Sequence, residues 1–257
     1  MRQHTAYFEV AGSMNTFFQE IRDTIFPKLE GKDGPLPPLL LALTIVTGLV
    51  DSFSYLVLSH VFVANMTGNV VFLAFALAGA KGFSIAYSLL AITAFLLGSL
   101  LGGKISSRAV PHRGRIATSA TSIQVILVGL AALISLISPN PIPTEYGYGL
   151  IICLAICMGI QYSVVRKLAV PDLATTVLTL TMTGIGADSR IAGGAGSKAG
   201  RRLLSIFSMF LGALIGALMI LYASSSYPLL IALIITAVVA SLARMFSRNN
   251  PPWISSK

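Results

Sequence analysis

The stretch Ala64-Asn65-Met66-Thr67-Gly68-Asn69 decides the fold, because it interrupts an uncharged tract that covers residues 52–80. The purely apolar run that follows it, residues 70–80, is 11 residues long. At 1.5 Å per residue this run makes about 16 Å of helix, whereas the hydrocarbon core of a bilayer is about 30 Å thick. The tract therefore predicts half a membrane span with a polar break rather than a complete crossing.

The composition of the whole chain indicates that such tracts lie in lipid. Of the 257 residues, 55% are hydrophobic and 11% are charged, whereas roughly a quarter of the residues in soluble proteins are charged. This composition excludes an ordinary soluble enzyme, and it excludes a disordered chain, since disorder accompanies low hydrophobicity. Eight apolar segments are predicted, at residues 37–59, 60–80, 82–103, 117–138, 146–165, 168–187, 203–223 and 228–245.

The segment at residues 168–187 is interrupted in a similar way. It opens with Pro171-Asp172, ends with two glycines, and contains Thr175, Thr176, Thr179, Thr181 and Thr183. Short polar side chains near a broken helix supply hydrogen bonds that lipid cannot. We therefore expect an all-α polytopic membrane protein with six transmembrane helices and two re-entrant or broken helical segments.

The positions of the 18 basic residues test this topology. If all eight segments crossed, with the N-terminus inside, 12 basic residues would lie inside and 6 outside. If the two interrupted segments return to the side they entered from, the division becomes 17 to 1, and only Lys81 lies outside. The positive-inside rule favours the second arrangement. It predicts that both termini are cytosolic, in a plasma membrane or a bacterial inner membrane.

Two parts of the chain resemble each other. Gly48-Leu49-Val50-Asp51 aligns with Gly159-Ile160-Gln161-Tyr162, and Leu97-Gly98-Ser99-Leu100-Leu101-Gly102 aligns with Leu211-Gly212-Ala213-Leu214-Ile215-Gly216. Three crossings in each part would give residues 36–138 and residues 146–245 opposite orientations. We therefore expect two inverted repeats, the plan of many transporters.

Two tails flank the predicted transmembrane domain at residues 36–245. In the first, residues 1–35, apolar residues between Phe17 and Leu29 recur at helical spacing. This pattern predicts an amphipathic helix that lies on the membrane surface or binds a soluble partner. The second tail covers residues 246–257, and both are expected in the cytosol. Basic loops such as the one around Arg201 are expected to meet anionic lipid headgroups rather than nucleic acid.

Several motifs together resemble one known family. These are Gly48-Leu49-Val50-Asp51, Val63-Ala64-Asn65-Met66-Thr67-Gly68-Asn69, Gly159-Ile160-Gln161, Val164-Val165-Arg166 and Ala174-Thr175-Thr176-Val177-Leu178-Thr179. They are similar to the YoaK-type family of bacterial and fungal integral membrane proteins, over residues 39–244. The resemblance implies a membrane protein of six spans and implies no activity. Tyr162 stands where the family commonly has Asn, and Leu180 where it has Gly, so the second motif is less polar here.

A carboxylate inside the first apolar segment is the sharpest functional signal. Asp51 follows Pro37 by 14 residues, about 21 Å into a helix at 1.5 Å per residue. A charge at the centre of a spanning helix costs about 2.5–3.5 kcal/mol on insertion scales. We expect Asp51 to face the protein interior, either as a coupling site for a proton or cation or as a structural hydrogen-bond anchor.

Polar residues of the two interrupted segments extend this candidate site. The residues expected to line a solute site near the membrane midplane are Asp51, Asn65, Thr67, Gly68, Asn69, Gln161, Thr175, Thr176 and Thr179. Broken helices form such sites in transporters. The same side chains could instead satisfy the broken backbone or join neighbouring helices, without any ligand.

No catalytic residue, metal site or cofactor is predicted, and we do not expect an enzyme. The three histidines are scattered and lack a metal-binding spacing. The small-residue pairs Gly98/Gly102 and Gly212/Gly216 favour close helix packing, between the two halves or between two protomers. One hypothesis is a permease or secondary transporter for a small solute. The other is a structural or lipid-binding membrane protein that transports nothing.

The topology makes a direct prediction for Lys81. In a chain whose two cysteines, Cys153 and Cys157, have been replaced by alanine, Lys81→Cys should react with a membrane-impermeant maleimide added to intact cells. Arg108→Cys should react only after the cells are permeabilised, because the charge distribution puts it on the cytosolic side. Labelling of Lys81→Cys only after permeabilisation would contradict the topology.

Overall fold

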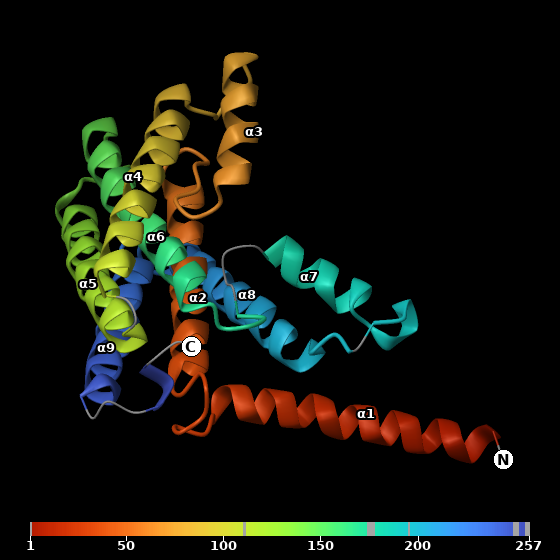
Figure 1. The fold of residues 1–257 in the computed structure, drawn as a ribbon. Helices are drawn as coiled ribbons and strands as arrows, with labels where there is room; N and C mark the ends of the chain where they lie inside the picture. Colours follow the sequence, from red (N-terminus) through yellow and green to blue (C-terminus); the bar gives the residue numbers. More distant parts are fainter. Residues whose placement is uncertain (1, 110–111, 174–177, 195, 249–251, 255–257) are drawn as a thin grey trace.

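The computed structural model describes residues 2–109, 112–173, 178–194, 196–248 and 252–254. Within these residues the chain forms nine α-helices and two short 3₁₀ helices, and no strand. The elements are α1 (Arg2–Ile25), α2 (Leu36–Val57), α3 (Met66–Leu77), α4 (Ile85–Ala109), α5 (Arg113–Ile137), α6 (Thr144–Leu168), α7 (Leu178–Ala187), η1 (Arg190–Ala192), α8 (Ala199–Tyr222), α9 (Tyr227–Ser247) and η2 (Pro252–Ile254), and Figure 1 shows their arrangement.

Six helices of the described chain are long and apolar enough to cross a membrane: α2, α4, α5, α6, α8 and α9. The two interrupted segments form only short apolar helices, α3 with 12 residues and α7 with 10. The expectation of an all-α protein with six spans is therefore confirmed. Helix α1 is longer than the apolar spacing near its C-terminal part suggested. It runs sideways from the beginning of α2, contacts α8 and projects beyond the bundle (Figure 1).

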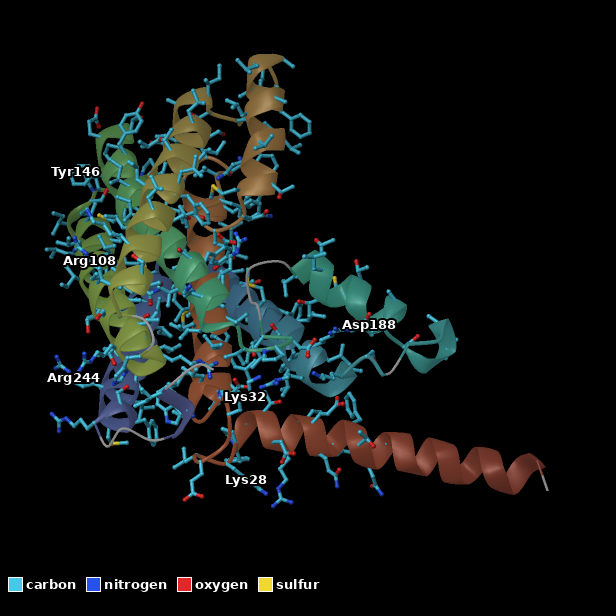
Figure 2. The ribbon with its side chains drawn as sticks, in the orientation of Figure 1. Lys28, Lys32, Arg108, Tyr146, Asp188 and Arg244 are labelled. Carbon is cyan, nitrogen blue, oxygen red and sulfur yellow. The ribbon has the colours of Figure 1, made fainter. Side chains whose placement is uncertain are left out.

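The two ends of the bundle differ in charge. Lys28, Lys32 and Arg244 lie at one end, and Tyr146 lies toward the other (Figure 2). We call the first the basic end, defined by Lys28, Lys32, Arg113 and Arg244. Helices α2, α5 and α8 begin at this end, and α4, α6 and α9 end there.

The helices of the first half and of the second half make matching contacts. Helix α2 packs on α8 and α9, and correspondingly α6 packs on α4 and α5. The short helix α3 packs on α4 as α7 packs on α8, and α5 packs on α9. Among the helices α2–α9, the contacts made by α2–α5 thus have counterparts made by α6–α9.

Glycines allow the two closest helix crossings. A Cβ atom at Gly98 would overlap the backbone of α6, and one at Gly159 would overlap the backbone of α4. Gly48 and Gly212 stand in the same relation between α2 and α8. Helix backbones can approach this closely only where side chains are absent. These glycine faces are therefore occupied by contacts within the chain.

The crossing of α4 and α6 should tolerate no added methyl group. Gly98→Ala should lower the free energy of unfolding by about 1–3 kcal/mol, because overpacking forces the two helices apart. The matched control is Gly129→Ala on α5, where the new Cβ atom would lie 3.6 Å from its nearest neighbour, Leu233, so no loss is expected. Thermal unfolding in detergent measures both, and equal melting temperatures for the two variants would contradict the packing argument.

Candidate functional site

A re-entrant hairpin, residues 58–77, follows α2. Ser59 and His60 have φ angles of 53° and 57°, a conformation that reverses the chain at the end of α2. The returning stretch is buried, and the amide of Ala64 donates a hydrogen bond of 3.0 Å to Oδ1 of Asp51. Because Asp51 lies six residues before the end of α2, the chain re-enters the bundle before α3 leads out again (Figure 1).

Two asparagines satisfy the backbone of this hairpin. Asn69 is fully buried, and its Nδ2 donates to the carbonyl oxygen of Phe62 at 2.5 Å while its Oδ1 accepts from the Phe62 amide at 2.9 Å. Asn65 caps α3 by accepting a bond of 3.2 Å from the amide of Gly68. Unpaired backbone groups in lipid cost several kcal/mol each. The asparagines and Asp51 therefore act together to make the break in the helix tolerable.

Aromatic rings close the hairpin at the end of the bundle opposite to the basic end. The rings of Tyr55 and Phe62 stack with centroids 4.8 Å apart, and Phe62 stacks on Phe72 at 5.7 Å. Phe83, in the turn after α3, lies 5.2 Å from Phe72. These contacts attach α3 to the end of α2 through ring packing.

A second polar centre lies deeper in the bundle, where α2, α5 and α6 meet. We call Thr47, Gln124 and Gln161 the glutamine centre. Nε2 of Gln161 donates to Oγ1 of Thr47 at 2.9 Å, and Nε2 of Gln124 lies 3.4 Å from Oε1 of Gln161. All three residues are at most 1% exposed. Thr47 and Gln124 each follow the first residue of their helix by 11 positions, so both lie about 16 Å from the basic end, half the thickness of a bilayer core.

A narrow cavity leads from the glutamine centre toward the basic end. It follows α2 from Leu43 back to Leu36 and α6 from Gln161 on to Leu168. Ala120 and other small or aliphatic residues of α5 and α9 complete its wall. The cavity leaves about 20 Å³ for the centres of water-sized molecules, and about 10–15 Å³ of such space holds one water. It is thus an apolar channel with a polar group at its inner end.

Two buried side chains close the basic end. Arg113 donates to the carbonyl oxygens of Lys32 and Leu168 at 2.8 Å and pairs with Asp33 at 3.1 Å. It thereby joins α5 to the last residue of α6 and to the loop before α2. Trp253 is 2% exposed and packs against Gly34 and the apolar residues around Leu36. The last described residues of the chain therefore fold back onto the bundle.

The second interrupted segment is held by charge. Asp172, in the loop after α6, pairs with Arg202 at 2.8 Å and with Lys198 at 3.2 Å. Arg202 also binds Asp188 at 2.7 Å, after the end of α7. These ion pairs tie the loop and α7 to the beginning of α8.

The structure separates the predicted site residues into groups. Asp51, Gly68 and Asn69 belong to the re-entrant hairpin, and Gln161 belongs to the glutamine centre. The side chains of Asn65, Thr67 and Thr179 are exposed on the short helices. Thr175 and Thr176 lie outside the described residues.

The sequence analysis missed two members of the glutamine centre, Thr47 and Gln124. A signal for the first was available, since the buried residues Thr44, Thr47, Asp51 and Ser54 recur at intervals of three and four along α2, the spacing of one helix face. Gln124 lies at the end of a run of hydroxyl residues in the first half of α5, with apolar residues after it. Their proximity was not visible in the sequence.

The fold and its buried polar centres define a multi-pass integral membrane protein. The family described as "Protein of unknown function (DUF1275)" matches residues 39–242, and the chain belongs to this family. It is 33% identical over 151 residues to UPF0700 transmembrane protein YoaK of Bacillus subtilis (strain 168), a match that covers 57% of this chain and 64% of that protein. The expected membership of a YoaK-type family is thus confirmed. No solved structure matches this chain.

The Asn69 side chain should be essential for stability. Asn69→Leu should lower the free energy of unfolding by about 2–4 kcal/mol, since it leaves the amide and carbonyl of Phe62 unpaired in a buried position. Asn65→Ala removes one exposed bond and should cost about 1 kcal/mol, a usual value for a helix cap. Thermal unfolding in detergent compares them, and an Asn69→Leu variant as stable as Asn65→Ala would refute the role assigned to Asn69.

Proposed function

We propose that this protein is a permease or secondary transporter that carries a small solute across a membrane. The observation that carries the proposal is the glutamine centre, a set of uncharged polar side chains buried halfway through a bundle of membrane-spanning helices. Polar groups at this depth are costly and generally mark the path of a solute or ion.

The matching contacts of the two halves support this proposal. Gly48 and Gly159 are 111 residues apart, and each lies against the backbone of the crossing helix of the other half. Each half contributes three spans and one short helix. Halves with three spans each run in opposite directions, and inverted repeats of this kind let a bundle open alternately to the two sides of a membrane.

The distribution of basic residues supports one orientation of the protein in the membrane. The positive-inside rule puts the basic end in the cytosol and Lys81 outside, with both termini cytosolic. A plasma membrane or a bacterial inner membrane fits this orientation. Arginine and lysine at the basic end would then face anionic lipid headgroups.

A second candidate function has its own support. The polar groups of the re-entrant hairpin pair with one another, through Asp51 with Ala64 and through Asn69 with Phe62. A hairpin whose polar groups form hydrogen bonds with each other and with Asp51 needs no ligand to pair them, as expected for a structural or lipid-binding protein. The glutamine centre, where one amide oxygen has no partner among the residues that the structure describes, distinguishes the transporter proposal from this alternative.

Transport by the purified protein tests the proposal. Proteoliposomes should be compared with protein-free vesicles for flux of water, ammonia, urea, methylammonium, potassium and acetate, with and without a pH gradient. We expect at least one of these fluxes to depend on the protein and to fall in Gln161→Leu, which removes the bond to Thr47.

The matched control for this experiment is Ser122→Ala, an exposed position on α5, which should transport normally. Asp51→Asn keeps an oxygen for the Ala64 amide but cannot exchange a proton at neutral pH. If Asp51 couples transport to protons, this variant should lose any effect of the pH gradient. Absence of every flux with the native protein would favour the structural alternative.

A further inference from the structure

We propose that the glutamine centre binds one uncharged molecule of about the size of water or ammonia, which both donates and accepts hydrogen bonds. This proposal rests on the proposed transport function and names its substrate class. It assigns a binding role to Gln124, which the sequence analysis did not single out.

The orphaned oxygen of Gln124 points to a ligand. Oε1 of Gln124 is buried and has no hydrogen-bond partner within the described part of the chain, and the residue is 1% exposed and lines the cavity. A buried acceptor without a partner costs about 1–3 kcal/mol. A molecule in the cavity that donates a hydrogen bond to this oxygen would remove that cost.

The rest of the centre requires the same molecule to accept a bond. An amide nitrogen carries two N–H groups, and both hydrogens of Gln161 have partners, Thr47 and the carbonyl oxygen of Leu43. Gln124 uses one N–H toward Gln161, at 3.4 Å, which is long beside the usual distance of about 2.9–3.0 Å. The second N–H of Gln124 is left to donate to a ligand. A ligand that donates and accepts therefore matches what Gln124 offers.

The wall of the cavity selects against charge. Every described residue that lines it is Leu, Val, Ala, Thr or Gln, so nothing there would compensate an ion. Removing a charge from water without a partner costs far more than one hydrogen bond returns. The nearest carboxylate along α2, Asp51, lies one turn beyond Thr47 and is already bonded to Ala64.

The size of the cavity sets the upper limit on the ligand. The space of about 20 Å³ for water-sized centres suits one such molecule. Urea has four non-hydrogen atoms and would have to displace the leucines of α2.

The test uses four probes on the full-length protein in proteoliposomes. Water flux is measured by osmotic shrinkage, ammonia entry by an internal pH dye, and urea and methylammonium serve as probes that are too large or charged. The native protein should raise the flux of water or ammonia and leave urea and methylammonium at the level of protein-free vesicles. Gln124→Met keeps the length of the side chain and removes the amide. It should reduce that flux about tenfold, the factor that corresponds to the loss of one hydrogen bond.

A second variant fills the cavity and keeps the amides. Ala120→Leu should block the flux, because Ala120 is 1% exposed and lines the cavity. Ser122→Ala on the same helix should leave it unchanged. The two test variants, Gln124→Met and Ala120→Leu, are accepted as folded when they elute as the native protein does in size-exclusion chromatography. If only one of them folds, its flux alone tests the binding site.

Two different results separate this proposal from the proposed function. Protein-dependent flux of urea or methylammonium, or a flux of water or ammonia that Gln124→Met and Ala120→Leu leave intact, would overturn the binding of a small uncharged molecule at the glutamine centre and leave transport standing. No protein-dependent flux of any solute would overturn both.

Discussion

The pairing of Asn69 with Phe62 is the interaction on which the architecture depends. A chain that turns back inside a bilayer exposes amide and carbonyl groups that lipid cannot bind. One asparagine side chain satisfies both the amide and the carbonyl group of Phe62, at 2.9 Å and 2.5 Å, and Asp51 accepts a hydrogen bond from the Ala64 amide at 3.0 Å. Without these bonds the amide and carbonyl of Phe62 and the amide of Ala64 would lack these partners inside the bundle, and the stretch after α2 could not return there at the same cost.

Much of the fold could be predicted because length and charge are direct physical requirements of the bilayer. The segments predicted at residues 37–59 and 228–245 correspond to α2 and α9 within a few residues, and the polar break at Asn65 marks the start of α3. The partners of each helix could not be predicted in the same way. In water the apolar face of a helix indicates the core, but a spanning helix is apolar on its lipid face as well. The meeting of Gln124 with Gln161, and the return of Trp253 to Gly34, depend on helix rotation and on chain reversal, which composition does not encode.

The two halves hold their interrupted segments by different means. Tyr162 occupies the position that corresponds to Asp51, and its ring packs edge to face on Phe95, with centroids 5.5 Å apart, instead of bonding a returning chain. The loop after α6 is held by Asp172, Lys198 and Arg202. Lys198 is 58% exposed, so its pair with Asp172 is weakened by salt. Arg202 and Asp172 are only 14% and 12% exposed, so their ion pair is largely shielded from solvent. The first hairpin is thus held by buried amide and carboxylate bonds, and the second segment is held mainly by a largely buried ion pair.

The glutamine centre is better explained by binding than by stability. A leucine at position 124 would remove an amide oxygen that has no hydrogen-bond partner within the described residues, and this change would favour the folded state. Replacing buried polar groups by apolar ones of similar volume is often neutral or stabilising. A chain whose spans consist mainly of apolar residues could have carried an apolar residue at Gln124 and Gln161 as well. The two amides instead face a cavity that leads to the basic end. Gln161 bonds to Thr47 and Leu43 and so joins α6 to α2, whereas the oxygen of Gln124 has no partner within the described residues and contributes no bond to the fold.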